Sequence, residues 1–184
     1  MSFYKVELKE HFNHRLFYEK PVSLTNDEIG LENSYILMEN NSLLNKSKFN
    51  NVDFFCEFGD NDNIVCLGQT LTINKKAKRI HLLAISTWID TVEFFDIVYD
   101  DKTVERIKIP FLNWIEISGT NCELYYYEKE ENVTTVSQTV TTGYFKRIVY
   151  FHHSYANLNA NKKIKKIVLP DNLLIHIFAI TLED

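Results

Sequence analysis

Two groups of side chains in this sequence have the types and spacing that carbohydrate binding requires. Trp88 precedes Asp90 by two positions, and Asn113 stands directly before Trp114. A sugar presents apolar C–H faces and many hydroxyl groups, so its binding sites combine an aromatic surface with planar side chains that donate and accept hydrogen bonds. We expect these residues to form a carbohydrate site together with three more from a third segment, namely His152, Tyr155 and Asn157.

The run from Asp60 to Asn63 offers oxygen atoms that suit a calcium ion. Calcium prefers carboxylates and amide or backbone carbonyls, which makes Asp60 and Asp62 candidate ligands of a structural calcium. The run lacks the glycine and the distal glutamate of an EF-hand loop, so the alternative is a solvated turn. We expect no other cofactor.

The histidines and cysteines do not indicate a transition-metal site. His152 and His153 are neighbours in the sequence, and neighbours in a strand point to opposite faces, so they do not share one ion by simple alternation. His81 and His176 stand among aliphatic residues, which predicts buried, hydrogen-bonded imidazoles. The three cysteines form no C-x-x-C pair and are expected to be reduced packing residues: Cys56, Cys66 and Cys122.

Sequence motifs that mark common catalytic sites are absent from the chain. It contains no G-x-S-x-G nucleophile elbow, no phosphate-binding G-x-x-x-x-G-K-S/T or G-x-G-x-x-G loop, and no H-E-x-x-H zinc motif. We therefore expect a protein that is not an enzyme.

The elements that must position these residues are β-strands, because apolar residues recur with period two along most of the chain. The runs at 79–86 and 173–182 are apolar on both faces, as expected of strands covered on both sides. The runs at 91–99 and 103–109 form a hairpin pattern around a polar turn, which Pro110 is expected to end. Further strands are expected at 53–58, 64–67, 122–127, 144–151 and 164–169.

This pattern predicts an all-β chain: a single β-sandwich or jelly roll over residues 1–184 with about eight to ten mostly antiparallel strands. At most one short helix is expected, within residues 25–44. The loops at the strand ends are expected to carry the sugar-binding side chains.

Composition excludes several partners. The 184 residues include 20 Lys and Arg against 25 Asp and Glu, a net charge of −5 that argues against a nucleic-acid binder. No stretch of about 18 uncharged apolar residues indicates a membrane span. The first residues alternate apolar and charged side chains and do not form a secretory signal, so we expect a cytoplasmic protein, or an extracellular one if a leader has been removed.

An ordered set of motifs resembles a known family. The motifs are NIVCLGQT at 63–70, RIHLLA at 79–84, VEFFDIVYDD at 92–101, Asn113-Trp114, KIVLP at 166–170 and IHIFAITL at 175–182. Together they resemble the galactose-binding-like β-sandwich, or jelly-roll, accessory domains of secreted bacterial and fungal glycoside hydrolases. The resemblance spans about residues 4–182 and implies sugar binding or structural support of a neighbouring domain.

The matched motifs mostly form the scaffold, so the resemblance transfers no binding residue. One departure is local: Lys102 replaces the glycine of the usual Asp-Gly hairpin turn. We expect a non-catalytic, lectin-like module that binds a carbohydrate or glycan. The alternative is a structural or protein-interaction protein, for example a homo-oligomer assembled through the strand that contains Tyr125, Tyr126 and Tyr127.

Overall fold

The computed structural model of the chain describes residues 2–23, 34–41, 43, 48–115, 132–143 and 146–184. These residues form fifteen strands, two one-turn 3₁₀ helices and no α-helix, which confirms the expected all-β class. No helix within these ranges is long and apolar enough to cross a membrane. The elements are β1 (Phe3–Lys5), η1 (Lys9–His11), β2 (Phe17–Tyr18), β3 (Ser34–Leu37), η2 (Met38–Asn40), β4 (Lys48–Phe49), β5 (Val52–Asp53), β6 (Ile64–Leu67), β7 (Thr70–Lys76), β8 (Arg79–Ser86), β9 (Thr91–Tyr99), β10 (Val104–Phe111), β11 (Val133–Val140), β12 (Thr142–Gly143), β13 (Ile148–Asn157), β14 (Lys163–Val168) and β15 (Asp171–Glu183).

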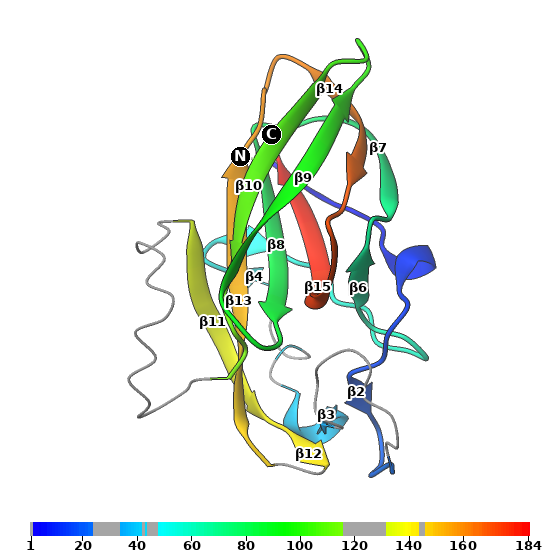
Figure 1. The fold of residues 1–184 in the computed structure, drawn as a ribbon, viewed down its shortest axis with the longest axis vertical. Helices are drawn as coiled ribbons and strands as arrows, with labels where there is room; N and C mark the ends of the chain where they lie inside the picture. The colour runs from blue at the N-terminus through cyan, green and yellow to red at the C-terminus, as the bar shows by residue number, and fades with distance from the viewer. Residues whose placement is uncertain (1, 24–33, 42, 44–47, 116–131, 144–145) are drawn as a thin grey trace.

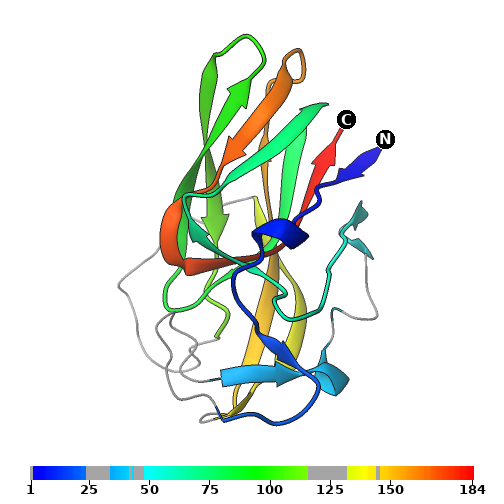
Figure 2. The ribbon, with the colours of Figure 1, turned by 90° about the vertical axis from the view of Figure 1, so that its right-hand side faces the viewer.

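Two antiparallel sheets build the sandwich. A six-stranded sheet has the order β1-β15-β8-β13-β11, with β6 also pairing β15, and a four-stranded sheet has the order β10-β9-β14-β7. Figure 1 shows the four-stranded sheet lying across β8, β13 and β15, and Figure 2 shows the two chain ends side by side, where β1 pairs with the end of β15. Two small sheets, β12-β3-β2 and β4-β5, lie on the periphery.

The space between the two large sheets is filled by apolar side chains, which we call the inner layer. On β8 these are Ile80, Leu82 and Ala84, which pack with Phe95 and Ile97 of β9. Because side chains alternate along a strand, every second residue of the two sheets faces this layer.

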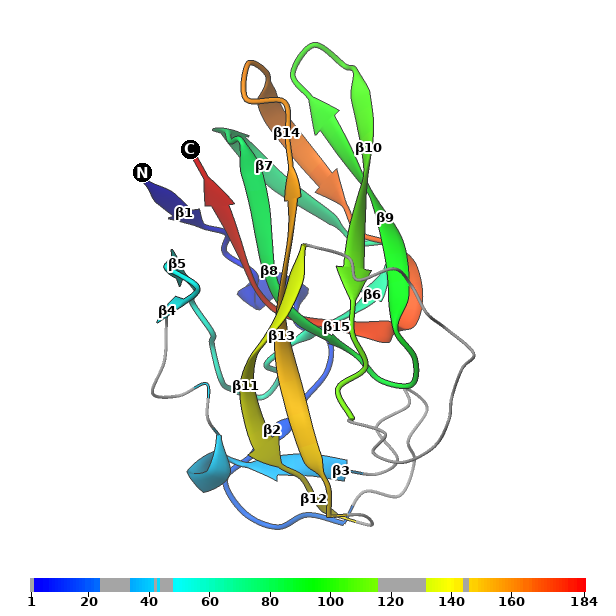
Figure 3. The same cartoon turned by 90° about the vertical axis from the view of Figure 1, so that its left-hand side faces the viewer.

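The opposite face of the six-stranded sheet is also buried, which explains why β8 and β15 are apolar on both faces. Leu83 and Ile85 of β8 lie in a second apolar cluster with Phe151 of β13. We call this cluster the outer layer. The short strands and loops before β6 cover it, as Figure 3 shows for β2 to β5. The expectation that these two strands are covered on both sides is confirmed.

The predicted hairpin is present as β9 and β10. Lys102 occupies the turn in place of glycine, and the second arm is longer than expected. Lys102 adopts a positive φ of 67° in a three-residue loop closed by a hydrogen bond from Tyr99 N to Thr103 O of 2.9 Å. This three-residue loop ends in a left-handed residue and is one of the common hairpin connections. Pro110 does not end the second arm, because β10 continues to Phe111. As the outermost strand of its sheet, β10 tolerates a residue that cannot donate.

The strand that carries His152 is longer than expected. β13 runs through Asn157, so His152, Tyr155 and Asn157 lie inside a strand and the expectation that they follow it in a loop is wrong. Two long strands, β7 and β11, were not expected, and neither were the short strands β2, β3, β4 and β12. Residues 54–63 form no strand apart from an isolated bridge at Asn63.

Three other expectations fall partly or wholly outside the described residues. The described part of residues 25–44 contains β3 and η2. Tyr125 to Tyr127 and Cys122 lie outside the described ranges. Cys66 is buried in the inner layer and Cys56 packs against the outer one, as expected of packing residues. Burial raises the pKa of Cys56 to about 12 and also raises that of Cys66.

Candidate functional site

Trp88 lies on the loop between β8 and β9 with its side chain exposed. β8 ends at Ser86 and β9 begins at Thr91, and 54% of the Trp88 surface is accessible to solvent. The start of this loop is fixed by a hydrogen bond of 3.0 Å from Thr87 N to Leu174 O of β15. The exposed Trp88 ring therefore lies on a loop whose first residue, Thr87, is hydrogen-bonded to β15.

Asp90 and Asn113 fasten the same loop. Asn113 N donates to Asp90 Oδ1 at 2.7 Å, and Asn113 Nδ2 donates to Trp88 O at 3.0 Å. Ile115 N donates to Asn113 Oδ1 at 3.1 Å. Among the described residues, no hydrogen bond engages the second carboxylate oxygen of Asp90 or the second N–H of the Asn113 amide. Both residues are half-buried, so these groups can still bond a ligand beside Trp88.

His152 supports Asn113 from β13. Its Nε2 lies 3.1 Å from Asn113 O, and its Nδ1 lies 3.1 Å from Thr135 Oγ1 of β11. A carbonyl oxygen only accepts, so Nε2 carries the proton and Nδ1 accepts from the threonine hydroxyl. Burial lowers the pKa of His152 to about 4, which leaves the ring neutral near pH 7. His152 is buried and positions Asn113 without facing solvent.

The other three predicted sugar-binding residues lie elsewhere. Trp114 is only 2% exposed and belongs to the outer layer, so the expectation that it offers a stacking surface is wrong. Its backbone pairs with Ser86 and Tyr150, which places the ring in the core. Tyr155 and Asn157 lie beside Arg79 of β8, whose Nε donates to Asn157 Oδ1 at 3.1 Å. The arginine Cζ is 5.9 Å from the centre of the Tyr155 ring.

The buried carboxylate of Asp62 holds two segments of the chain together through hydrogen bonds. Asp62 is buried, and its carboxylate accepts from Leu16 N at 3.0 Å, from Phe17 N at 2.9 Å and from Asn63 Nδ2 at 2.8 Å. Burial raises the pKa of Asp62 to about 6, against the effect of these donors, which favour the carboxylate. Asp60 is exposed on the neighbouring turn. Within the described ranges, no three His, Cys, Asp or Glu side chains gather as a metal site.

A chain of hydrogen bonds crosses the outer face of the six-stranded sheet. Asn50 Nδ2 lies 3.2 Å from His153 Nδ1, His153 Nε2 lies 3.0 Å from His81 Nδ1, and His81 Nε2 lies 3.1 Å from Glu183 Oε2. With the Asn50 amide as donor, each histidine accepts on Nδ1 and donates from Nε2, so the bonds run in one direction to the carboxylate. Burial lowers the pKa of His81, and it lowers that of His153 to about 4.

Both ends of this series of hydrogen bonds are fixed, one by a charged residue and the other by a turn with positive φ values. Lys78 Nζ is 3.1 Å from Glu183 Oε1, which supplies a cation for the buried carboxylate. Asn50 and Asn51 form the β4–β5 turn with φ values of 49° and 65°. Asparagine tolerates this left-handed conformation better than most residues. All nitrogen atoms of the two histidines are bonded, so the arrangement is structural.

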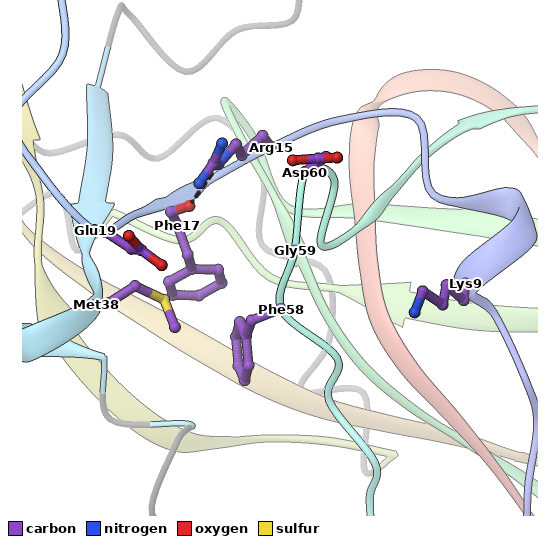
Figure 4. Close-up of a pocket in the computed structure, with 8 residues that line it drawn as sticks. All are labelled: Lys9, Arg15, Phe17, Glu19, Met38, Phe58, Gly59 and Asp60. Atoms are coloured by element: carbon purple, nitrogen blue, oxygen red, sulfur yellow. Dashed lines mark hydrogen bonds between the residues drawn. The ribbon is translucent and has the colours of Figure 1, made fainter.

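A pocket of about 370 Å³ opens beside β2, and sequence reasoning did not find it. Figure 4 shows its apolar wall and its charged side chains, with Glu19 beside Met38 and Lys9 on the opposite side. Asp60 is the one lining residue that the sequence suggests as a ligand. No local pattern joins the lining residues, which come from four separate segments: Lys9, Arg15, Phe17, Glu19, Met38, Phe58, Gly59 and Asp60.

A protein family matches this chain in comparison with known proteins. The family model described as "AziU2-like beta-sandwich domain" matches residues 22–184. The match covers the strands of both large sheets except β1. No curated protein matches the chain at a significant level.

Proposed function

This chain belongs to the AziU2-like β-sandwich domain family, and we propose that it uses its sandwich as a scaffold for non-catalytic carbohydrate binding. The exposed Trp88 is the observation that carries the proposal. Large aromatic side chains are usually buried, and Trp114 of the same chain is. A tryptophan left 54% exposed on a fastened loop is available to stack on the apolar face of a sugar ring.

The polar neighbours of Trp88 supply the second requirement. The free oxygen of Asp90 accepts from a sugar hydroxyl, and the free N–H of Asn113 donates to one. His152 fixes Asn113 through its carbonyl, so the site loses little conformational entropy on binding. The resemblance to galactose-binding-like accessory domains of glycoside hydrolases supports the same ligand class.

A second candidate function is protein binding through the same loop. Ile89 is exposed beside Trp88, and Leu173 is exposed in the segment of β15 that bonds Thr87. Tryptophan with aliphatic neighbours is typical of the centre of a protein interface. In this alternative the partner is another protein or a second copy of the chain, and no sugar is bound.

A panel of immobilised glycans separates the two candidates. We expect one class of glycan to bind the unmodified protein, and Trp88→Ala to weaken that binding by about tenfold or more through loss of the stacking surface. The matched control is Phe94→Ala, which removes an aromatic side chain 49% exposed on β9 and is expected to bind normally. Equal glycan binding by Trp88→Ala would refute the site. If no glycan binds and Trp88→Ala abolishes a measured self-association, the second candidate holds.

A further inference from the structure

The pocket beside β2 has walls that are fixed before any ligand arrives. One wall comes from residues 15–19 and the other from residues 58–60. Asp62 joins them through its bonds to Leu16 N and Phe17 N, and Asp62 N donates to His14 O at 2.9 Å. A pocket held by a buried carboxylate is preorganised, which reduces the entropic cost of binding.

Phenylalanine and methionine side chains form the apolar wall of this pocket. Phe58 packs edge-on against Phe17, with the ring centres 5.0 Å apart and the planes at 88°. Phe17 is anchored in the outer layer against Phe151 and Phe178. Met38 completes the wall, as Figure 4 shows. This surface suits an apolar side chain of modest size.

The charged lining is balanced, with Lys9 and Arg15 against Glu19 and Asp60. Among the ion pairs of the described residues, none joins two of these four side chains. Arg15 is oriented, because its Nε donates to Phe17 O at 3.0 Å and its guanidinium lies 4.5 Å from the centre of the Tyr18 ring. Within the described ranges, no hydrogen bond or ion pair engages its two terminal nitrogen atoms, which suit a carboxylate.

We propose that this pocket binds a small zwitterion with an apolar side chain, namely a free α-amino acid or a related amino carboxylate. The ligand carboxylate pairs with Arg15, the ammonium group pairs with Glu19, and the side chain packs against Phe58 and Met38. An amino acid pairs with one cation and one anion of the lining, so the two lining charges that remain are of opposite sign and cancel, whereas a simple anion or cation would leave a net charge in the pocket. A volume of about 370 Å³ holds a molecule of this size.

Titration calorimetry of the full chain with related compounds tests the proposal. The probes are phenylalanine and methionine, phenylalaninamide, N-acetylphenylalanine and glycine. We expect saturable binding of the first two. The amide lacks the carboxylate, the N-acetyl compound lacks the ammonium group and glycine lacks the apolar side chain, so each is expected to bind about tenfold more weakly or worse.

Variants locate the binding site. Glu19→Gln is expected to weaken phenylalanine binding while leaving the already weak binding of N-acetylphenylalanine unchanged, because that compound has no ammonium group to lose. The matched control is Glu10→Gln, an exposed glutamate of η1 outside the pocket lining. Gly59→Leu gives a steric test: among the described residues, a Cβ at Gly59 meets only Asn61 O at 3.7 Å, an ordinary contact, and a larger side chain at this lining position is expected to narrow the pocket.

Three outcomes would overturn the proposal. They are the absence of phenylalanine and methionine binding at millimolar concentration, equal binding of phenylalanine and its two charge-blocked forms, and phenylalanine binding that Glu19→Gln and Gly59→Leu leave unchanged. The Trp88 loop shares no residue with this pocket. Glycan binding at Trp88 and amino-acid binding here therefore succeed or fail independently.

Discussion

The two faces of the six-stranded sheet are buried by different means. The inner layer consists of apolar side chains, such as Leu82 on β8 and Phe95 on β9. The outer face combines an aromatic cluster with buried polar groups, including His81, His153 and Glu183. Apolar packing has little direction, whereas buried polar groups must find partners. The inner layer therefore determines how the sheets stack, and the outer face determines where the covering loops lie.

The comparison predicts that the inner layer contributes most to stability and does so independently of pH. Phe95→Ala is expected to lower the free energy of unfolding by about 3–5 kcal/mol, because it removes a fully buried ring that stacks on Phe111 and leaves a cavity. Phe94→Ala removes the neighbouring ring on the exposed side of the same strand and is expected to cost less than about 1 kcal/mol.

Urea denaturation of both variants at pH 7 and pH 5 measures these effects. The Phe95→Ala loss should be the same at the two pH values, since no titratable group is removed. A loss below that of Phe94→Ala would show that the layer is not packed as described.

The two buried histidines of β13, which lie on opposite faces of the sheet, are expected to make stability sensitive to acid. His152 and His153 have pKa values of about 4 in the fold against an ordinary value of 6.5. The unfolded chain therefore binds more protons between these pH values, and stability falls as the pH is lowered through them. At pH 5 each histidine costs about 2 kcal/mol relative to pH 7. The lowered pKa of His81 acts in the same direction.

Asp62 acts in the opposite direction. Its pKa of about 6 lies above the ordinary 3.8, so the folded chain binds more protons at pH 5 and gains about 1.4 kcal/mol there. We expect a net loss of about 2–3 kcal/mol between pH 7 and pH 5 in urea denaturation. Stability that is constant or rises over this interval would contradict the buried, neutral state of the histidines.

Replacing Asp62 has a smaller effect on the free energy of unfolding. Asp62→Asn is expected to cost about 1–3 kcal/mol at pH 7, because an amide offers one acceptor oxygen to the N–H groups of Leu16, Phe17 and Asn63. It should also enlarge the loss between pH 7 and pH 5, since the opposing titration is gone. An exposed control, Asp60→Asn, should change neither quantity.

The smallest expected effect concerns the hairpin outside both layers. Lys102→Gly should raise the free energy of unfolding by about 0.5–1 kcal/mol, because glycine adopts a φ of 67° without the steric cost of a Cβ. Thermal unfolding measures this change. Lys108→Gly, at a strand position of the same hairpin, should be destabilising instead.

The sequence predicts the parts of the fold that depend on short-range periodicity. β8 and β15 are recognisable because apolar residues at successive positions can only be buried by two separate layers. β13 extends beyond its apolar pattern, since His153 is buried and Tyr155 is half-buried by partners far along the chain, such as Asn50 and His81.

The candidate sites are predictable only in part. Trp88, Asp90 and Asn113 are suggested by their types, and hydrogen bonds join them across 23 to 25 positions. The pocket beside β2 escapes prediction because Asp62 brings its walls together across 45 and 46 positions, which no local pattern reveals. Nothing in the residue types distinguishes the exposed Trp88 from the buried Trp114.

Tryptophan emission during titration with glycans tests the carbohydrate proposal most directly, because the two tryptophans occupy opposite environments. Trp88 is 54% exposed and Trp114 is 2% exposed. We predict a red-shifted, quenchable component from Trp88 that one class of glycan alters in a saturable way, while the blue-shifted component from Trp114 stays unchanged. If the Trp88 component is unaffected by every glycan, the chain does not bind sugar at this loop.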